Sequence, residues 1–187
     1  MVWLAKAALV ATVAALRAEK NLQRLLLAFA AATRRPGRLV PARLVIVGDG
    51  PERPALQALA VDLGIMQCVS FAGHVADPAP LYAGFDLFAL SSDTEQMPIA
   101  VIEAMAAGLP VAATDVGDVR SMLAEANAPF VVARDDAALA AGLGSLLDDT
   151  DLRARIGAAN RARAREMFDQ ERMFAAYAAL FDGEPPP

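Results

Sequence analysis

The chain of 187 residues is long enough for one α/β domain with a sizeable core and too short for two full domains. Its 56% hydrophobic and 21% charged residues are typical of a folded globular protein and exclude a disordered one. A net charge of -5 without a dense Lys/Arg cluster excludes sequence-independent nucleic-acid binding, which needs a basic surface.

Strand-like and helix-like segments alternate along the chain. The first predicted strand, Leu9 to Val13, precedes a helix over Leu22 to Thr33 with apolar residues at i, i+3, i+4 and i+7. The other predicted strands are Arg43 to Val47, Cys68 to Phe71, Phe85 to Leu90, Val111 to Ala113 and Phe130 to Val132. The other predicted helices are Ala55 to Leu63, Pro98 to Ala107, Arg120 to Glu125, Ala137 to Leu147, Asp151 to Phe168 and Gln170 to Phe181, with a helical turn at Pro80 to Ala83. This alternation predicts one α/β domain over residues 1–187, a three-layer Rossmann-like parallel sheet with helices on both faces.

The beginning of the chain admits two interpretations. Ala7 to Leu16 is apolar enough to be the core of a secretory signal peptide, whereas Val10 to Val13 also fits a short strand. Lys6 leaves too short an apolar run for a membrane-spanning helix. We favour the strand, and we expect a preceding domain to be absent from the chain.

Three further features have simple structural explanations. Cys68 is the only cysteine and cannot form an internal disulfide, so a buried thiol is expected. The Arg-rich stretch from Arg153 to Arg165 indicates a solvated helix face, with contact to an anionic membrane surface as the alternative. Gly48-Asp-Gly-Pro51 lacks the spacing of a dinucleotide-binding turn, which favours a tight turn between strand and helix.

Two carboxylates bracket the predicted start of one helix. Glu103 is the only charged residue from Pro98 to Thr114, and a carboxylate among apolar neighbours is costly unless it is paired or faces a cleft. An exposed position on the helix surface is the alternative. Glu95 lies eight positions earlier, in the loop after a strand, where parallel sheets bind ligands. Because a helix N-terminus favours phosphate, the pair suits a nucleotide sugar, with one carboxylate for the ribose and one for the sugar.

The segment Glu95-Gln-Met-Pro-Ile-Ala-Val-Ile-Glu103 resembles the Glu-x₇-Glu signature of the retaining family 4 glycosyltransferases, which have the GT-B fold. Other segments match that family in order and spacing: Leu16 to Asn21, Val45 to Arg53, Phe71 to His74, Leu90 to Ser92 and Glu103 to Asp115. The resemblance covers most of the chain, from about Leu9 to Phe181. It implies the donor-binding half of a GT-B fold.

The resemblance also implies roles for the matching residues. Glu95, the implied catalytic residue, would bind donor-sugar hydroxyls, Glu103 would hold the ribose, and Lys20 would bind the diphosphate. The other implied donor-binding residues are Gln96, Met97, Pro98 and Ile99 beside sugar and phosphate, Gly73 and His74 beside the base, and Gly48 in a turn that borders the donor site. A solvent-facing structural role is the alternative for His74, the only histidine. No metal and no cofactor is implied, because cationic side chains and amides stabilise the leaving diphosphate.

Three departures from the family pattern weaken the expectation of activity. The family's frequent Gly-Arg-Leu is Ala14-Ala15-Leu16 here, and Arg17 is the candidate replacement for the phosphate-binding arginine. The later Gly-Gly-x-Pro-Glu is Gly117 to Ser121 and lacks its Glu. The family's N-terminal acceptor domain, which usually supplies a catalytic histidine, has no counterpart before Leu9. We therefore expect the chain to be inactive alone.

The first hypothesis is a domain that, joined to its N-terminal domain, transfers a sugar from a nucleotide-diphosphate sugar to an acceptor hydroxyl with retention. The alternatives are a non-catalytic module that binds a nucleotide sugar or docks a partner chain, and an epimerase or phosphorylase, which the Glu-x₇-Glu context disfavours. Family habit suggests a surface polysaccharide or lipid-linked glycan as acceptor and a cytoplasmic location, with peripheral contact to the inner face of the membrane. The last helix, Gln170 to Phe181, is the expected contact surface for the absent domain.

Overall fold

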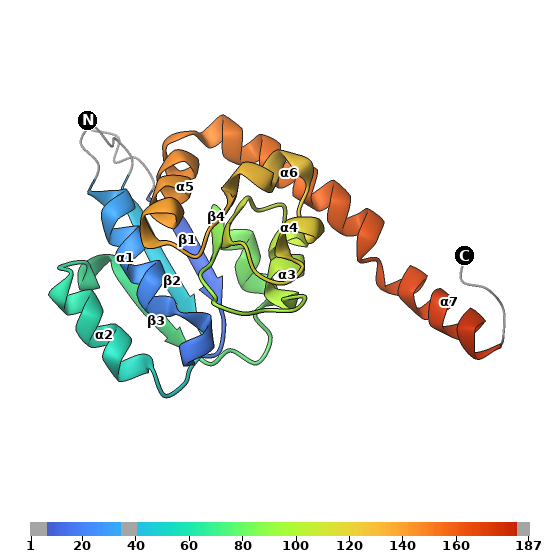
Figure 1. The fold of residues 1–187 in the computed structure, drawn as a ribbon, viewed down its shortest axis with the longest axis horizontal. Helices are drawn as coiled ribbons and strands as arrows, with labels where there is room; N and C mark the ends of the chain where they lie inside the picture. Colours follow the sequence, from blue (N-terminus) through green and yellow to red (C-terminus); the bar gives the residue numbers. More distant parts are fainter. Residues whose placement is uncertain (1–6, 35–40, 183–187) are drawn as a thin grey trace.

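Six parallel strands form one sheet in the computed structural model, which describes residues 7–34 and 41–182 (Figure 1). The strands are β1 (Ala8–Val13), β2 (Ala42–Val47), β3 (Val69–Gly73), β4 (Leu87–Leu90), β5 (Val111–Thr114) and β6 (Val131–Val132). Their spatial order is β3-β2-β1-β4-β5-β6, and every pair is parallel. The predicted strands are confirmed, including the N-terminal one, which lies at the centre of the sheet. The strand order reverses between β1 and β4, and this switch point is where such sheets bind ligands.

Helices cover both faces of the sheet. The α-helices are α1 (Leu22–Thr33), α2 (Arg53–Asp62), α3 (Ile99–Ala107), α4 (Val119–Met122), α5 (Asp136–Asp148), α6 (Thr150–Met167) and α7 (Gln170–Phe181). The 3-10 turns are η1 (Ala18–Lys20), η2 (Met66–Cys68), η3 (Ala79–Gly84) and η4 (Glu125–Phe130). Helix α1 packs against α2 and α5, while α3 packs against α6 and η3. Helix α7 extends away from this body (Figure 1).

The apolar core is divided between the two faces of the sheet. In β4, Leu87 and Ala89 belong to the cluster that includes residues of α1 and α5, whereas Phe88 and Leu90 belong to the cluster that includes residues of α3. Successive side chains of a strand point to opposite faces, so a strand buried on both sides is apolar throughout. The predicted three-layer Rossmann-like fold is confirmed.

Cys68 and the predicted helix at Arg120 to Glu125 differ from expectation. Cys68 is the last residue of η2 and is half-buried, so the prediction of a buried thiol within a strand was wrong. The helix ends at Met122, because the next backbone is extended and the amide of Ala124 donates to the buried side chain of Asn160 at 3.2 Å. The chain then continues into η4.

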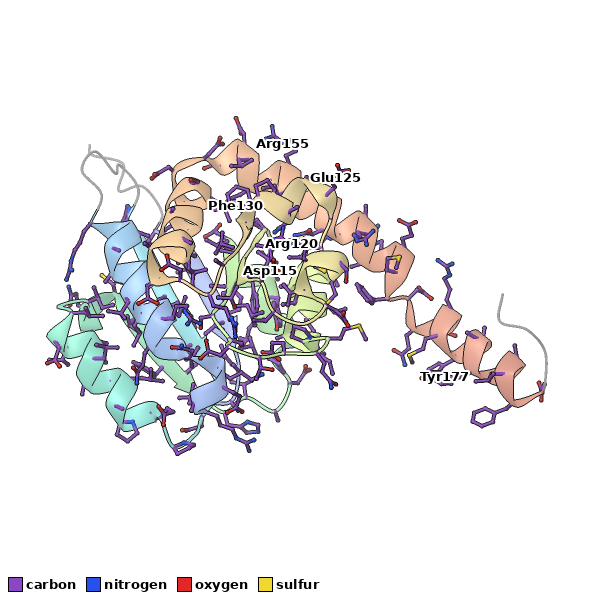
Figure 2. The ribbon with its side chains drawn as sticks, in the orientation of Figure 1. Asp115, Arg120, Glu125, Phe130, Arg155 and Tyr177 are labelled. Atoms are coloured by element: carbon purple, nitrogen blue, oxygen red, sulfur yellow. The ribbon has the colours of Figure 1, made fainter. Side chains whose placement is uncertain are left out.

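Three arginines of α6 bind the ends of other helices. Arg153 donates to Leu147 O of α5 at 3.0 Å, Arg161 to Ala107 O of α3 at 3.1 Å, and Arg163 to Met122 O of α4 at 2.9 Å. These last-turn carbonyls have no partner within their own helices, and they form the negative end of the helix dipole. Arg153 and Arg163 are half-buried, so the predicted solvated face does not include them, whereas Arg161, Arg165 and Arg155 (Figure 2) are exposed as predicted. Within residues 7–34 and 41–182, no helix is both long and apolar enough to span a membrane.

Candidate functional site

The ion pair between Lys20 and Glu95 lies at the switch point of the sheet. Lys20 ends the turn after β1, and Glu95 lies in the loop between β4 and α3. Lys20 Nζ donates to Glu95 Oε1 at 2.7 Å, and Ser92 Oγ donates to the same oxygen at 2.7 Å. Only 9% of the Glu95 side chain is exposed, compared with 24% for Lys20. No described residue donates to Glu95 Oε2, so this oxygen can accept hydrogen bonds from a ligand.

A polar cluster joins the two segments that carry this pair. Asn21 adopts a left-handed conformation with φ of 40°; its Oδ1 accepts from Arg24 N and its Nδ2 donates to Asp93 Oδ2 at 3.0 Å. Arg24 Nη1 donates to Asp93 Oδ1 at 2.7 Å and to Ser91 O at 2.9 Å. The hydrogen bond from Arg24 lowers the pKa of Asp93, so this carboxylate is ionised at neutral pH. The cluster therefore fixes the turn after β1 against the loop after β4.

Gly117 packs against the backbone of the loop that carries Glu95. A Cβ atom at this position would lie 2.3 Å from Glu95 O and 2.5 Å from Gln96 O, and the φ of 51° is one that other residues rarely adopt. The next amide, Asp118 N, donates to Gln96 O at 2.9 Å. Only glycine therefore fits where the turn after β5 meets the backbone that carries Glu95.

Glu103, on α3, lies beside a pocket. Its side chain is half-buried, and Tyr82 Oη donates to Glu103 Oε2 at 2.7 Å. The pocket has a volume of about 480 Å³ and is lined by Ala79, Tyr82, Ala83, Glu103, Ala106, Ala107 and Arg161. The carboxylate is thus hydrogen-bonded and lines a hollow, which are the two conditions that make it tolerable among apolar neighbours.

The exposed side chains of Gln96, Met97 and Ile99 surround the start of α3, with Pro98 at its N-cap. Among the described residues, no side chain caps this helix, so its first amides can bind an anion.

The other predicted residues divide between two hollows. Gly48 and the exposed His74 line a hollow of about 260 Å³ at the ends of β1, β2 and β3. Gly73 lies at its edge, because its carbonyl accepts from Gly48 N at 2.8 Å. Arg17 lines a different hollow of about 200 Å³ with Glu52 of the turn before α2. The structure therefore groups Gly48, Gly73 and His74, while Arg17 begins the turn that Lys20 ends, with Lys20 N donating to Arg17 O at 3.0 Å. Within the described part of the chain, no three His, Cys, Asp or Glu side chains are placed to share a metal ion.

Sequence reasoning missed Arg24 and Tyr82, and it pointed to Asp93 and Gly117 only as members of the loops that follow the strands. Asp93 shares the polar loop with Glu95, and a turn glycine after a strand can indicate a close backbone approach. Tyr82 lies in an otherwise apolar turn, where a buried hydroxyl needs a partner. No sequence signal indicated that Arg24 faces this loop.

The fold and this site match a known class of proteins. The family model for glycosyl transferases group 1 matches residues 3–163, and the chain belongs to this family. It is 34% identical over 140 residues to the lipopolysaccharide core biosynthesis glycosyltransferase LpsD of Rhizobium meliloti, covering 74% of this chain and 41% of LpsD. It is 31% identical over 143 residues to N-acetyl-alpha-D-glucosaminyl L-malate synthase of Bacillus anthracis, covering 76% of this chain and 38% of that protein. The chain thus spans less than half the length of these relatives.

Solved structures show the same relationship. The structure of Anabaena HepE in complex with UDP and glucose superimposes with a TM-score of 0.83 at 25% identity, covering 95% of this chain and 49% of HepE. WaaG, a glycosyltransferase involved in lipopolysaccharide biosynthesis, superimposes with a TM-score of 0.79 at 27% identity, covering 95% of this chain and 48% of WaaG. The domain is accordingly one half of a GT-B fold.

Proposed function

We propose that the chain is the donor-binding half of a retaining glycosyltransferase and binds a nucleotide-diphosphate sugar at the switch point between β1 and β4. The Lys20–Glu95 contact carries the proposal, because it places a cation and a carboxylate beside the start of α3, which no described side chain caps. HepE, which has been solved with UDP and with UDP-glucose, supports a nucleotide sugar as the ligand.

In the proposed reaction, the bond between sugar C1 and the diphosphate breaks, C1 bonds to an acceptor oxygen on the same face, and the proton of the acceptor hydroxyl passes to the leaving diphosphate. Lys20 and the first amides of α3 stabilise the negative charge of the leaving diphosphate. Glu95 binds the sugar hydroxyls and Glu103 the ribose hydroxyls. The backbone near Gly73 lies beside the base.

We assign the acceptor site to an N-terminal domain outside this chain. The relatives, which are more than twice as long as the matched segments, support this assignment. Helix α7 supports it as well, because it buries none of its residues and exposes apolar side chains such as Tyr177 (Figure 2). Because LpsD and WaaG are named for lipopolysaccharide synthesis, we infer a lipid-linked or surface glycan as acceptor and a cytoplasmic site of action with peripheral membrane contact.

Thermal unfolding of the purified chain with UDP, GDP, ADP and their sugar conjugates tests the proposal. A nucleotide at a hundred times its dissociation constant stabilises the fold by about 2.7 kcal/mol. We expect at least one nucleotide to do so, and Glu103→Ala to reduce the effect. The control Glu125→Ala removes an exposed carboxylate of η4 and should keep the response (Figure 2). If no nucleotide stabilises the wild type, the proposed function is wrong.

A further inference from the structure

Tyr82 is held by the core on the inner side of Glu103. Only 2% of it is exposed, although η3 lies at the surface. Its ring stacks on Phe88 of β4 with centroids 5.9 Å apart and meets the edge of Phe85 at 6.0 Å. Such contacts fix the plane of an aromatic ring. The core of the domain, and not the surface, therefore sets the position of the Tyr82 hydroxyl.

The hydroxyl of Tyr82 is directed at Glu103. Tyr82 Oη lies 2.7 Å from Glu103 Oε2, a distance typical of a hydroxyl that donates to a carboxylate, and 3.3 Å from Ala100 O. Burial raises the pKa of Tyr82, and the hydrogen bond to Glu103 raises it further. The hydroxyl thus remains protonated and remains a donor throughout the neutral pH range.

Glu103 depends on this one bond for its orientation. A glutamate side chain has several rotamers, and an isolated one on a helix would sample them. Among the described residues, Tyr82 alone donates to the Glu103 carboxylate, and it uses only Oε2. The lining of the adjacent pocket is otherwise alanine, apart from Arg161. Oε1 is therefore left to a ligand in that pocket.

We propose that Tyr82 is a positioning residue that fixes the Glu103 carboxylate so that its free oxygen accepts hydroxyl groups of the nucleotide ribose. This inference rests on the function proposed above and adds the residue on which the orientation of Glu103 depends. It predicts a selective effect: loss of the hydroxyl weakens the grip on the nucleoside and leaves the phosphate contacts at Lys20 unchanged.

Isothermal titration calorimetry with UDP and with inorganic pyrophosphate distinguishes the nucleoside contact at Glu103 from the phosphate contacts at Lys20. GDP and ADP serve as further nucleotide probes. Tyr82→Phe keeps the ring and removes one hydrogen bond, so we expect about fivefold to tenfold weaker UDP binding. Pyrophosphate, which has no nucleoside, should bind as to the wild type. In a Glu103→Ala background, Tyr82→Phe should cause no further loss. The control is Tyr177→Phe, which removes the hydroxyl of the other tyrosine, exposed on α7.

A second variant, Glu103→Asp, tests whether a weaker affinity of Tyr82→Phe comes from the lost hydrogen bond or from a change in core packing. Glu103→Asp leaves the aromatic core intact and shortens the side chain, so its carboxylate cannot reach both Tyr82 and the pocket; we expect the same selective loss of UDP affinity. Equal UDP affinity in wild type and Tyr82→Phe overturns the positioning role and leaves the proposed function standing. A parallel loss of UDP and pyrophosphate affinity also overturns it. If the wild type binds no nucleoside diphosphate, both proposals fail.

Discussion

Lys20 Nζ and Glu95 Oε1 lie 2.7 Å apart although 75 positions of sequence separate the two residues. The contact exists because β1 and β4 are neighbours in the sheet and their following loops leave it at the same edge. An ammonium group has three donors, so Lys20 can hold Glu95 and phosphate oxygens at the same time. A donor molecule would thus find the two groups already oriented by each other.

Lys20→Ala should weaken the binding of pyrophosphate and of UDP by about 10- to 100-fold, the usual effect of losing one charge-assisted hydrogen bond. Titration calorimetry measures both affinities. Arg155→Ala is the matched control, because it removes one positive charge from the exposed side of α6 (Figure 2). Unchanged pyrophosphate binding in Lys20→Ala would place the diphosphate elsewhere.

Gly117→Ala should displace the loop that carries Glu95, because the added Cβ would meet Glu95 O at 2.3 Å. We expect a loss of about 1 to 3 kcal/mol in the free energy of unfolding, together with weaker binding of a nucleotide sugar. Urea unfolding and titration calorimetry check the two effects. The control Gly84→Ala adds a Cβ that meets nothing within 4 Å and should change neither quantity much. Similar behaviour of the two variants would contradict the role assigned to Gly117.

Asp93 should make stability depend on acid pH. Its pKa is lowered, chiefly by the hydrogen bond from Arg24, so its contribution to stability is complete above its usual value of 3.8 and is lost as the pH falls through the lower folded value. We expect the unfolding free energy of the wild type to fall from about pH 5 to about pH 3, and to fall less in Asp93→Asn. Urea titrations at each pH measure this. Glu125→Gln, at an exposed carboxylate, should keep the wild-type slope, and an equal slope in Asp93→Asn would refute the prediction.

Asn160→Ala should destabilise the fold strongly. This fully buried amide donates to Leu109 O and Asn127 Oδ1, both at 2.9 Å, and accepts from Ala124 N. Its removal leaves buried polar groups without partners, at a cost of about 2 to 4 kcal/mol in urea unfolding. Arg165→Ala on the exposed side of the same helix should stay within about 0.5 kcal/mol of the wild type. A comparable effect of both variants would show that the amide network contributes little.

Helix α7 should cause self-association of the isolated chain. Met173, Phe174, Tyr177, Leu180 and Phe181 are all exposed on it, and an apolar surface of this kind seeks a partner. Sedimentation velocity should show oligomers at high concentration, and Phe174→Ser combined with Phe181→Ser should yield a monomer. Val61→Ser, at an exposed apolar residue of α2, should leave the oligomers intact. A wild-type chain that stays monomeric would count against an interface on α7.

Sequence patterns predicted most of the fold because they are local. The apolar spacing of Leu22 to Thr33 and the helix at Gln170 to Phe181 reproduce the observed bounds of α1 and α7. The error at Arg120 to Glu125 arose from Asn160, which lies 36 positions beyond the amide of Ala124 that it binds. No local pattern contains that contact.

The residues of the candidate site also divide into those that local sequence patterns predict and those that depend on long-range contacts. Lys20 and Glu95 follow strand ends, Glu103 is the lone charge of an apolar helix, and all three match a family motif, so the sequence alone pointed to them. Tyr82 and Arg24 take part through side-chain contacts with residues 21 and 69 positions away, respectively. Such contacts form only in the folded protein, where the core fixes the ring of Tyr82 and the loop after β4 meets the start of α1.

The bond from Arg161 to the last carbonyls of α3 also affects the opposite end of that helix. A guanidinium at the carbonyl end compensates the negative pole of the helix, whereas among the described residues no side chain caps the amide end. The positive pole of the α3 dipole therefore stays uncompensated beside the loop that carries Glu95. Because backbone amides form this pole, its charge does not depend on pH. Lys20 can be removed by one substitution, but this second source of attraction for an anion persists in Lys20→Ala.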